Sequence, residues 1–116
     1  MDISLATVDY LNGSGIGAVA YHAVPADRPE EFLVVEQTGG DSGNRVQTRA
    51  SVDVDCWSST RKGAASLADS VRAALFGMPD ALDNVFHVEV TTVYNNPDLD
   101  SGTPRYTVGV DIHINE

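Results

Sequence analysis

The chain has 116 residues, seventeen of them acidic and seven basic, and its formal net charge is −10. This charge argues against a protein that binds nucleic acid tightly, because such binding needs clustered Lys and Arg. The sequence also shows neither a transmembrane-length apolar run nor a leader pattern. We therefore expect that the protein does not associate with a membrane and that it is assembled in a cytoplasm. A chain of this length buries roughly 65% of its unfolded surface, so we expect one domain over residues 1–116.

The first segment has the pattern of a short helix followed by a turn. Residues 2–11 carry apolar side chains close to helical spacing, namely Ile3 or Leu5, Val8 and Leu11. The glycine-rich residues that follow lack the spacing, the preceding strand and the lysine of a phosphate-binding loop. We therefore expect a plain turn from helix into sheet.

Two apolar runs then predict two strands, near residues 17–24 and 32–37, with a polar connector between them. The second run is followed by a series of small, turn-forming residues: Thr38, Gly39, Gly40, Asp41, Ser42, Gly43 and Asn44. Such a composition supplies little apolar area to fix a loop within one subunit. We expect a mobile loop that is ordered by contact with a neighbouring subunit, and we count it as an interaction site.

The centre of the chain predicts a half-buried strand followed directly by a helix. Apolar or small residues alternate along the strand near residues 46–57, with Val46, Thr48, Ala50, Val52, Val54 and Cys56 on the inner face. The helix near residues 60–76 carries one apolar stripe, formed by Ala64, Leu67, Ala68, Val71 and Leu75. Ser58, Ser59 and Thr60 offer N-caps, and we expect Gly77 to end the helix in a left-handed conformation before Pro79.

The outer face of this central strand carries Arg49, Asp53, Asp55 and Trp57. The two aspartates could be a pair of carboxylates for acid–base chemistry, but a charged rim that contacts a partner is the simpler interpretation. Trp57 has two interpretations. It is either an interface anchor or a side chain that folds back over the start of the helix.

Two long alternating segments, near residues 85–95 and 105–115, predict a closing hairpin. If Tyr94 faces Tyr106, every apolar residue of one segment meets a partner in the other: Thr92 with Val108, Val90 with Val110, Val88 with Ile112 and Phe86 with Ile114. The polar loop between the segments, rich in Asn, Pro, Asp and Gly, is a second expected interaction site, with Asn95, Asn96, Asp98 and Asp100.

The same register brings together His87, His113, Glu89 and Asp111 on the other face of the hairpin. Two imidazoles and two carboxylates could in principle bind a transition metal or shuttle a proton. An open sheet supplies no pocket for such chemistry, and a solvated or subunit-facing polar face accounts for the same residues. We therefore expect no catalytic residue, no metal site and no cofactor.

From Pro25 onward, the order of features resembles the tail terminator family of long-tailed bacteriophages. The segments that carry the resemblance are the connector 24–32 leading into Leu33-Val-Val, the turn Thr38-Gly-Gly, the strand Val52-Asp-Val-Asp-Cys-Trp, the helix segment 64–75 and the closing segment 103–112. The resemblance rests on their order and spacing, because none of these segments is diagnostic alone.

The resemblance implies an α+β fold, with two helices packed on a mixed or mostly antiparallel sheet of about five strands. It also implies a homohexameric ring in the tail or neck of the virion, which caps the tail tube, stops its polymerisation and joins the head connector. The implied partners are other copies of the chain, the major tail tube protein and a head-tail connector or neck protein, while DNA passes through the ring without specific binding.

Two alternatives stay open. The first is a small ferredoxin-like domain that binds a ligand or a metal through the His87, Glu89, Asp111 and His113 face. The second is another neck or connector component of the same virion.

Overall fold

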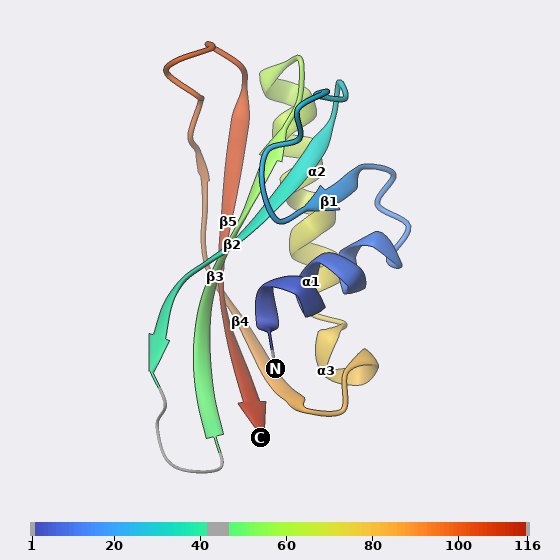
Figure 1. Ribbon diagram of the computed structural model, residues 1–116, viewed down its shortest axis with the longest axis vertical. Coiled ribbons are helices and arrows are strands. Elements are labelled where there is room, and N and C mark those ends of the chain that lie inside the picture. The colour runs from blue at the N-terminus through green and yellow to red at the C-terminus, as the bar shows by residue number, and fades with distance from the viewer. Residues whose placement is uncertain (1, 42–46, 116) are drawn as a thin grey trace.

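The computed structural model describes residues 2–41 and 47–115. Its elements, in chain order, are α1 (Ile3–Asn12), β1 (Val19–Tyr21), β2 (Phe32–Asp41), β3 (Gln47–Trp57), α2 (Arg61–Leu75), α3 (Met78–Ala81), β4 (Val85–Asn95) and β5 (Arg105–Asn115) (Figure 1). The five strands form one sheet in the order β1-β2-β3-β5-β4. β1 runs parallel to β2, and the other neighbours are antiparallel. This confirms the α+β class and the mixed, mostly antiparallel sheet.

The helices cover one face of the sheet and leave the other open (Figure 1). α2 packs on β3, β5 and β4, while α1 packs on β1 and β2. The predicted stripe of α2 is buried along its whole length, and the inner residues of β3 from Ala50 to Cys56 are buried against it. Each fully buried Val or Leu side chain contributes about 1.5–3 kcal/mol of transfer free energy, so this layer contributes most of the stability.

Cys56 lies in this layer and is fully buried. Burial first, and then the charge of Asp55, raise the pKa of its thiol well above the usual value. The thiol therefore stays protonated at neutral pH, which is the behaviour of an unreactive core residue.

The two long helices begin at side-chain caps and meet at one hydrogen bond. Asp2 caps α1 by accepting from the backbone N–H of Leu5, and Thr60 caps α2 by accepting from that of Gly63. The Tyr10 hydroxyl of α1 donates to the carbonyl oxygen of Ala74, near the C-terminus of α2, at 2.5 Å. That carbonyl is one of the four that a helix end leaves without an intrahelical partner.

The prediction for Gly77 is wrong: its φ is −86°, so it is not left-handed. A Cβ at this position would lie 2.7 Å from the Tyr10 hydroxyl oxygen, so the glycine is needed for the close approach of Tyr10. The short helix α3, from Met78 to Ala81, begins directly after Gly77.

β2 is longer than predicted. The segment from Thr38 to Asp41, predicted as the start of a mobile loop, continues the strand and pairs with β3 after a bulge between Gln37 and Gly39. Gly40 has φ +140°, and a Cβ there would lie 2.2 Å from the Arg49 carbonyl oxygen. Glycine is therefore required by this close strand pairing, not by a flexible turn. Ser42, Gly43, Asn44 and Val46 lie outside the described residues. β1, in contrast, is shorter than predicted.

The hairpin register is correct in its middle and wrong at both ends. His87 faces His113, Val88 faces Ile112, Glu89 faces Asp111 and Val90 faces Val110, as predicted. Register shifts between Val85 and His87 and between Val90 and Thr92 then move the remaining pairs by one residue: Val85 faces Ile114, Val93 faces Val108 and Asn95 faces Tyr106. Alternation predicts a period of two but cannot reveal an extra residue inserted on one strand.

Candidate functional site

The candidate site is the face of the sheet opposite the helices, which we call the outer face. The strand register lines its residues up in rows across β2, β3 and β5, with β4 completing some of them. From one end of the sheet to the other, the rows are Phe32–Trp57–Arg105, Val34–Asp55–Thr107, Glu36–Asp53–Gly109, Ser51–Asp111–Glu89 and Arg49–His113–His87. The outer face thus changes from aromatic, through acidic, to imidazole along its length.

The middle of the outer face is acidic. Its carboxylates are Glu36, Asp53, Asp55, Glu89 and Asp111. Burial, together with the nearby charges of Asp55 and Glu36, raises the pKa of the Asp53 carboxyl above its usual value. The negative charges on this face therefore repel one another in the isolated subunit.

Hydroxyl groups hold two of these carboxylates in place. The Thr107 hydroxyl donates to Asp55 Oδ1 at 2.7 Å and accepts from Asn96 Nδ2 at 3.1 Å. The Ser51 hydroxyl donates to Asp111 Oδ1 at 2.8 Å. The predicted residues Asp55 and Asn96, which are far apart in sequence, thus belong to one hydrogen-bonded chain.

Trp57 is on the outer face, as predicted, but it is not exposed. Its side chain is 3% exposed and stacks on Phe32, with ring centroids 5.2 Å apart. The guanidinium groups of Arg28 and Arg105 lie 5.1 and 4.9 Å from its ring centroid. Trp57 therefore neither folds over the start of α2 nor projects as a free anchor, because it forms a small second core with Phe32 and Val34.

Sequence reasoning missed Phe32, Arg28 and Arg105 as neighbours of Trp57. A signal was present, because Phe32 and Val34 share a strand face and occupy the outer side of an apolar run.

The loop of residues 96–104, which the sequence predicted as an interaction site, is fixed by its own hydrogen bonds. The backbone N–H of Asp98 donates to the Thr103 carbonyl oxygen at 3.0 Å, and Arg105 Nε donates to the Asn96 carbonyl oxygen at 2.8 Å. A hydrogen bond from the Ser101 hydroxyl lowers the pKa of the exposed Asp98 carboxyl. Asn95 belongs to β4, and Asp100 lies exposed in the loop.

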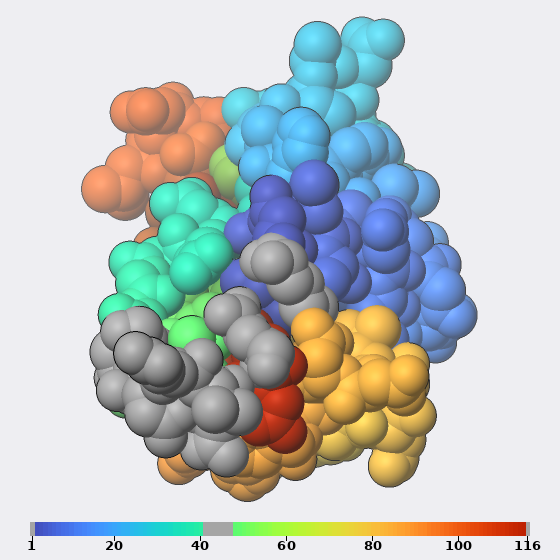
Figure 2. All heavy atoms as spheres, turned by 60° about the horizontal axis from the view of Figure 1, so that its bottom comes forward, coloured from blue at the N-terminus to red at the C-terminus, as the bar shows by residue number. Residues whose placement is uncertain are grey.

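Residues 38–41, the described part of the first predicted interaction segment, and the loop of residues 96–104 lie at opposite ends of the sheet in a molecule 43 Å long (Figure 1). The loop of residues 96–104 adjoins the Trp57 end. At the opposite end, the last residues of β2 and the first residues of β3 lie beside the last residues of β5. Figure 2 looks onto this second end, where α1, the segment around α3 and the last residues of β5 come together. The structure therefore does not unite the predicted residues in one site, but distributes them over two ends and the face between them.

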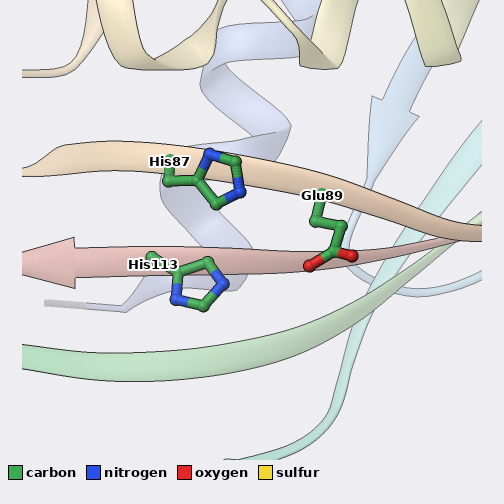
Figure 3. Close-up of side chains that lie close together, drawn as sticks. All are labelled: His87, Glu89 and His113. Atoms are coloured by element: carbon green, nitrogen blue, oxygen red, sulfur yellow. The ribbon is translucent and has the colours of Figure 1, made fainter.

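The imidazole end of the outer face holds three potential ligands (Figure 3). The donor atoms of His87, Glu89 and His113 all lie within 4.8 Å of one another. The ring centroids of His87 and His113 are 5.2 Å apart, and those of Phe86 and His113 are 5.9 Å apart. Asp111, the fourth residue of the predicted cluster, is turned to the Ser51 hydroxyl instead.

The two edges of the sheet carry exposed apolar side chains. Phe86, Val93 and Tyr94 lie on the β4 edge, while Leu5, Val19 and Val24 lie on or beside α1 and β1 at the other edge; each is between 38% and 51% exposed. The β1 side also holds a hollow of about 420 Å³, which is lined by Val8, residues 20–24 and Pro25. These are two different apolar surfaces, and burial of either one against another molecule would be favourable in free energy.

Within the described residues, no helix is long and apolar enough to span a membrane. A comparison with curated proteins finds no match. Among solved structures, the chain is similar to one in the virion of a native gene transfer agent particle, with 11% identity and a TM-score of 0.65 over 95% of this chain and 84% of that one. At this identity the likeness shows a shared fold.

A comparison with protein families matches residues 9–114 to the family described as Tail completion protein gp17. The match covers most of the chain, and it agrees with the resemblance to tail terminators. Members of such a family are structural proteins of the virion, found in its tail or neck. The chain therefore belongs to the tail completion protein gp17 family.

Proposed function

We propose that this tail completion protein forms a ring, most simply a hexamer, that caps the tail tube, stops its polymerisation and offers the surface to which the head connector or neck protein binds. In this role it performs no catalysis and needs no substrate. Its partners are other copies of itself, the major tail tube protein and the connector, and it is assembled in the host cytoplasm.

The observation that carries this proposal is the pair of unlike sheet edges. β4 and β1 are the edge strands, and β4 has backbone groups without a sheet partner on one side. On β1, the Asn12 side chain bonds the backbone N–H and the carbonyl oxygen of Ala20. Both edges also expose apolar side chains of the kind that interfaces bury. Contact between the β4 edge of one copy and the β1 edge of the next is heterologous, and repetition of such a contact gives a closed ring when the rotation between copies closes.

The acidic outer face supports a central channel for DNA. Glu36 and Asp53 share a row, Asp55 lies in the next row, and the remaining two carboxylates continue the same face. In a ring that turns this face inward, several copies would concentrate negative charge around the channel. Within a Debye length of about 8 Å, that charge discourages phosphates from binding, so DNA passes without being held.

The two ends of the sheet suit a ring with different neighbours above and below. The Trp57 end presents the hydrogen-bonded loop 96–104, including Leu99, which is 92% exposed. The other end presents the tips of β2 and β3. One end would contact the tail tube and the other the connector.

Complementation of a phage that lacks the gene tests this proposal. Wild-type protein should restore tails of uniform length that carry heads, and Val93→Lys should not, because it places a charge in the proposed β4 contact. Ser66→Lys, on an exposed position of α2, is the matched control and should restore tails fully. Normal virions without the protein, or full rescue by Val93→Lys, would overturn the proposal.

The ferredoxin-like enzyme alternative gains little from the structure. His87 and Glu89 are exposed, and they do not line the hollow beside β1. Substrate sites in enzymes are usually concave and bury most of the ligand. A role as a different neck component differs from our proposal in where the ring sits, and labelled antibody imaging of tails would separate the two.

A further inference from the structure

The imidazole end of the outer face has the donor set of a metal site. His87 and His113 face each other on β4 and β5, and Glu89 follows two residues later on the same face as His87. The three side chains project from the two strands towards a common space (Figure 3). Because main-chain pairing of the two strands fixes the positions of all three Cα atoms, little backbone order has to be gained for a metal to bind.

The distances are within reach of a first coordination shell. In a tetrahedral zinc site, with bonds of about 2.0–2.2 Å, neighbouring ligand atoms are about 3.3–3.6 Å apart. Here the donor atoms lie within 4.8 Å of one another, so the largest adjustment is about 1.5 Å. Side-chain rotation can supply it, since His87 and Glu89 are exposed and not locked by packing.

The local structure supports this geometry. The register shift between Val85 and His87 lies directly beside the site, and bulges of this kind re-aim side chains at functional positions. The Phe86 ring, 5.9 Å from that of His113, forms an apolar wall on one side. The carboxylate of Asp111, opposite Glu89, adds negative charge that favours cation binding. The positive charge of Arg49, opposite His113, works against it.

We propose that His87, Glu89 and His113 bind one divalent transition-metal ion of the zinc class. Two imidazoles and one carboxylate favour zinc, cobalt, nickel or copper over magnesium and calcium, which prefer shells made entirely of oxygen. Three protein ligands leave one position for water, and the ion would link β4 to β5 at the end of the sheet. This role is structural and does not depend on the ring proposed above.

Native mass spectrometry of the untagged protein tests the site, with zinc chloride as the probe. Wild-type protein should bind one zinc ion, and excess magnesium should not displace it. His87→Gln and His113→Gln should each weaken zinc binding at least about tenfold, since even removal of an outer-shell partner typically costs 10–100-fold. Glu89→Gln should weaken binding too.

Two matched controls separate this site from general binding to an acidic protein. His22→Gln removes the third histidine, which follows β1 at the other edge of the sheet, and Glu36→Gln removes a carboxylate of the same face. Both should bind zinc as the wild type does, and circular dichroism should show every variant folded. No zinc adduct in the wild type, displacement by magnesium, or an unchanged adduct in the His87→Gln/His113→Gln double variant would overturn the proposal.

Discussion

The two faces of the sheet are built from the same strands but differ in what completes them. On the inner face, Val52, Val54 and Cys56 of β3 are fully buried beneath α2. On the outer face, their neighbours Asp53 and Asp55 are half-buried, and the Thr107 hydroxyl donates to the Asp55 carboxylate. Helices of the same chain cover the inner face, whereas within the described residues no helix covers the acidic outer face (Figure 1).

This difference separates stability from function. Apolar residues on the inner face are selected by packing, and their loss costs folding free energy directly. Clustered carboxylates on the outer face repel one another and bring the isolated subunit no equivalent gain. Residues that cost free energy in the subunit are good candidates for a role in the assembled tail.

The largest expected effect is that of Leu67→Asp on α2. It buries an unpaired charge and removes packing, so we expect a loss of about 3–5 kcal/mol in the free energy of unfolding. Ser66→Asp, one residue away and exposed, should change it by less than about 0.5 kcal/mol. Urea denaturation of both variants measures the difference, and similar midpoints would contradict the burial of this stripe.

Trp57→Ala tests whether the outer face has a core of its own. Loss of a buried tryptophan that stacks on Phe32 should destabilise the protein by about 3 kcal/mol. Trp57→Phe should cost clearly less, because it keeps the ring stack, and the indole Nε1 that it removes has no hydrogen-bond partner among the described residues. If both substitutions left the thermal midpoint unchanged, Trp57 would not be buried in the isolated subunit.

Gly40→Ala tests the extension of β2. The added Cβ meets the Arg49 carbonyl oxygen in a backbone conformation that only glycine adopts readily, so we expect a cost of about 1–3 kcal/mol. Gly39→Ala, where a Cβ would meet open space, is the control and should cost much less. Equal effects in chemical denaturation would favour a loose loop over a strand at this position.

The smallest expected effect is that of Asp53→Asn. A folded-state pKa above the unfolded value means that folding is favoured with the proton bound, so stability falls as pH rises from about 3.8 through the raised pKa. At neutral pH the variant should therefore gain at most a few tenths of a kcal/mol, because solvent screens this half-buried group. Thermal melts of both proteins at pH 4 and pH 7 should show a gain at pH 7 alone, and a loss at pH 7 would contradict the repulsion.

Periodicity was enough to predict much of the fold. Two-residue alternation identified β3 and the hairpin, and three-and-four spacing identified α2, because each element has one buried face. The misplaced hairpin ends come from two bulges, and the misplaced start of the loop comes from Gly39 and Gly40. Glycine permits both a turn and a close strand pairing, so composition could not decide between them.

The outer face was harder to predict than the core. Alternation placed Asp53, Asp55 and Trp57 on it, but the neighbours that bury Trp57 come from β2, β5 and the connector before β2. Such contacts depend on strand order, which the sequence pattern of one strand does not contain. The pairing of His87 with His113 was predictable because both lie within one hairpin.

Chemical cross-linking of assembled tails tests the central claim, the joining of unlike sheet edges, most directly. A Val19→Cys/Val93→Cys variant places thiols on the two edges, while the native thiol of Cys56 is buried and should not react. We predict that a short bismaleimide reagent gives a ladder of cross-linked copies ending at one discrete size, whereas each single variant gives none. Uncross-linked monomers from intact tails would contradict the account.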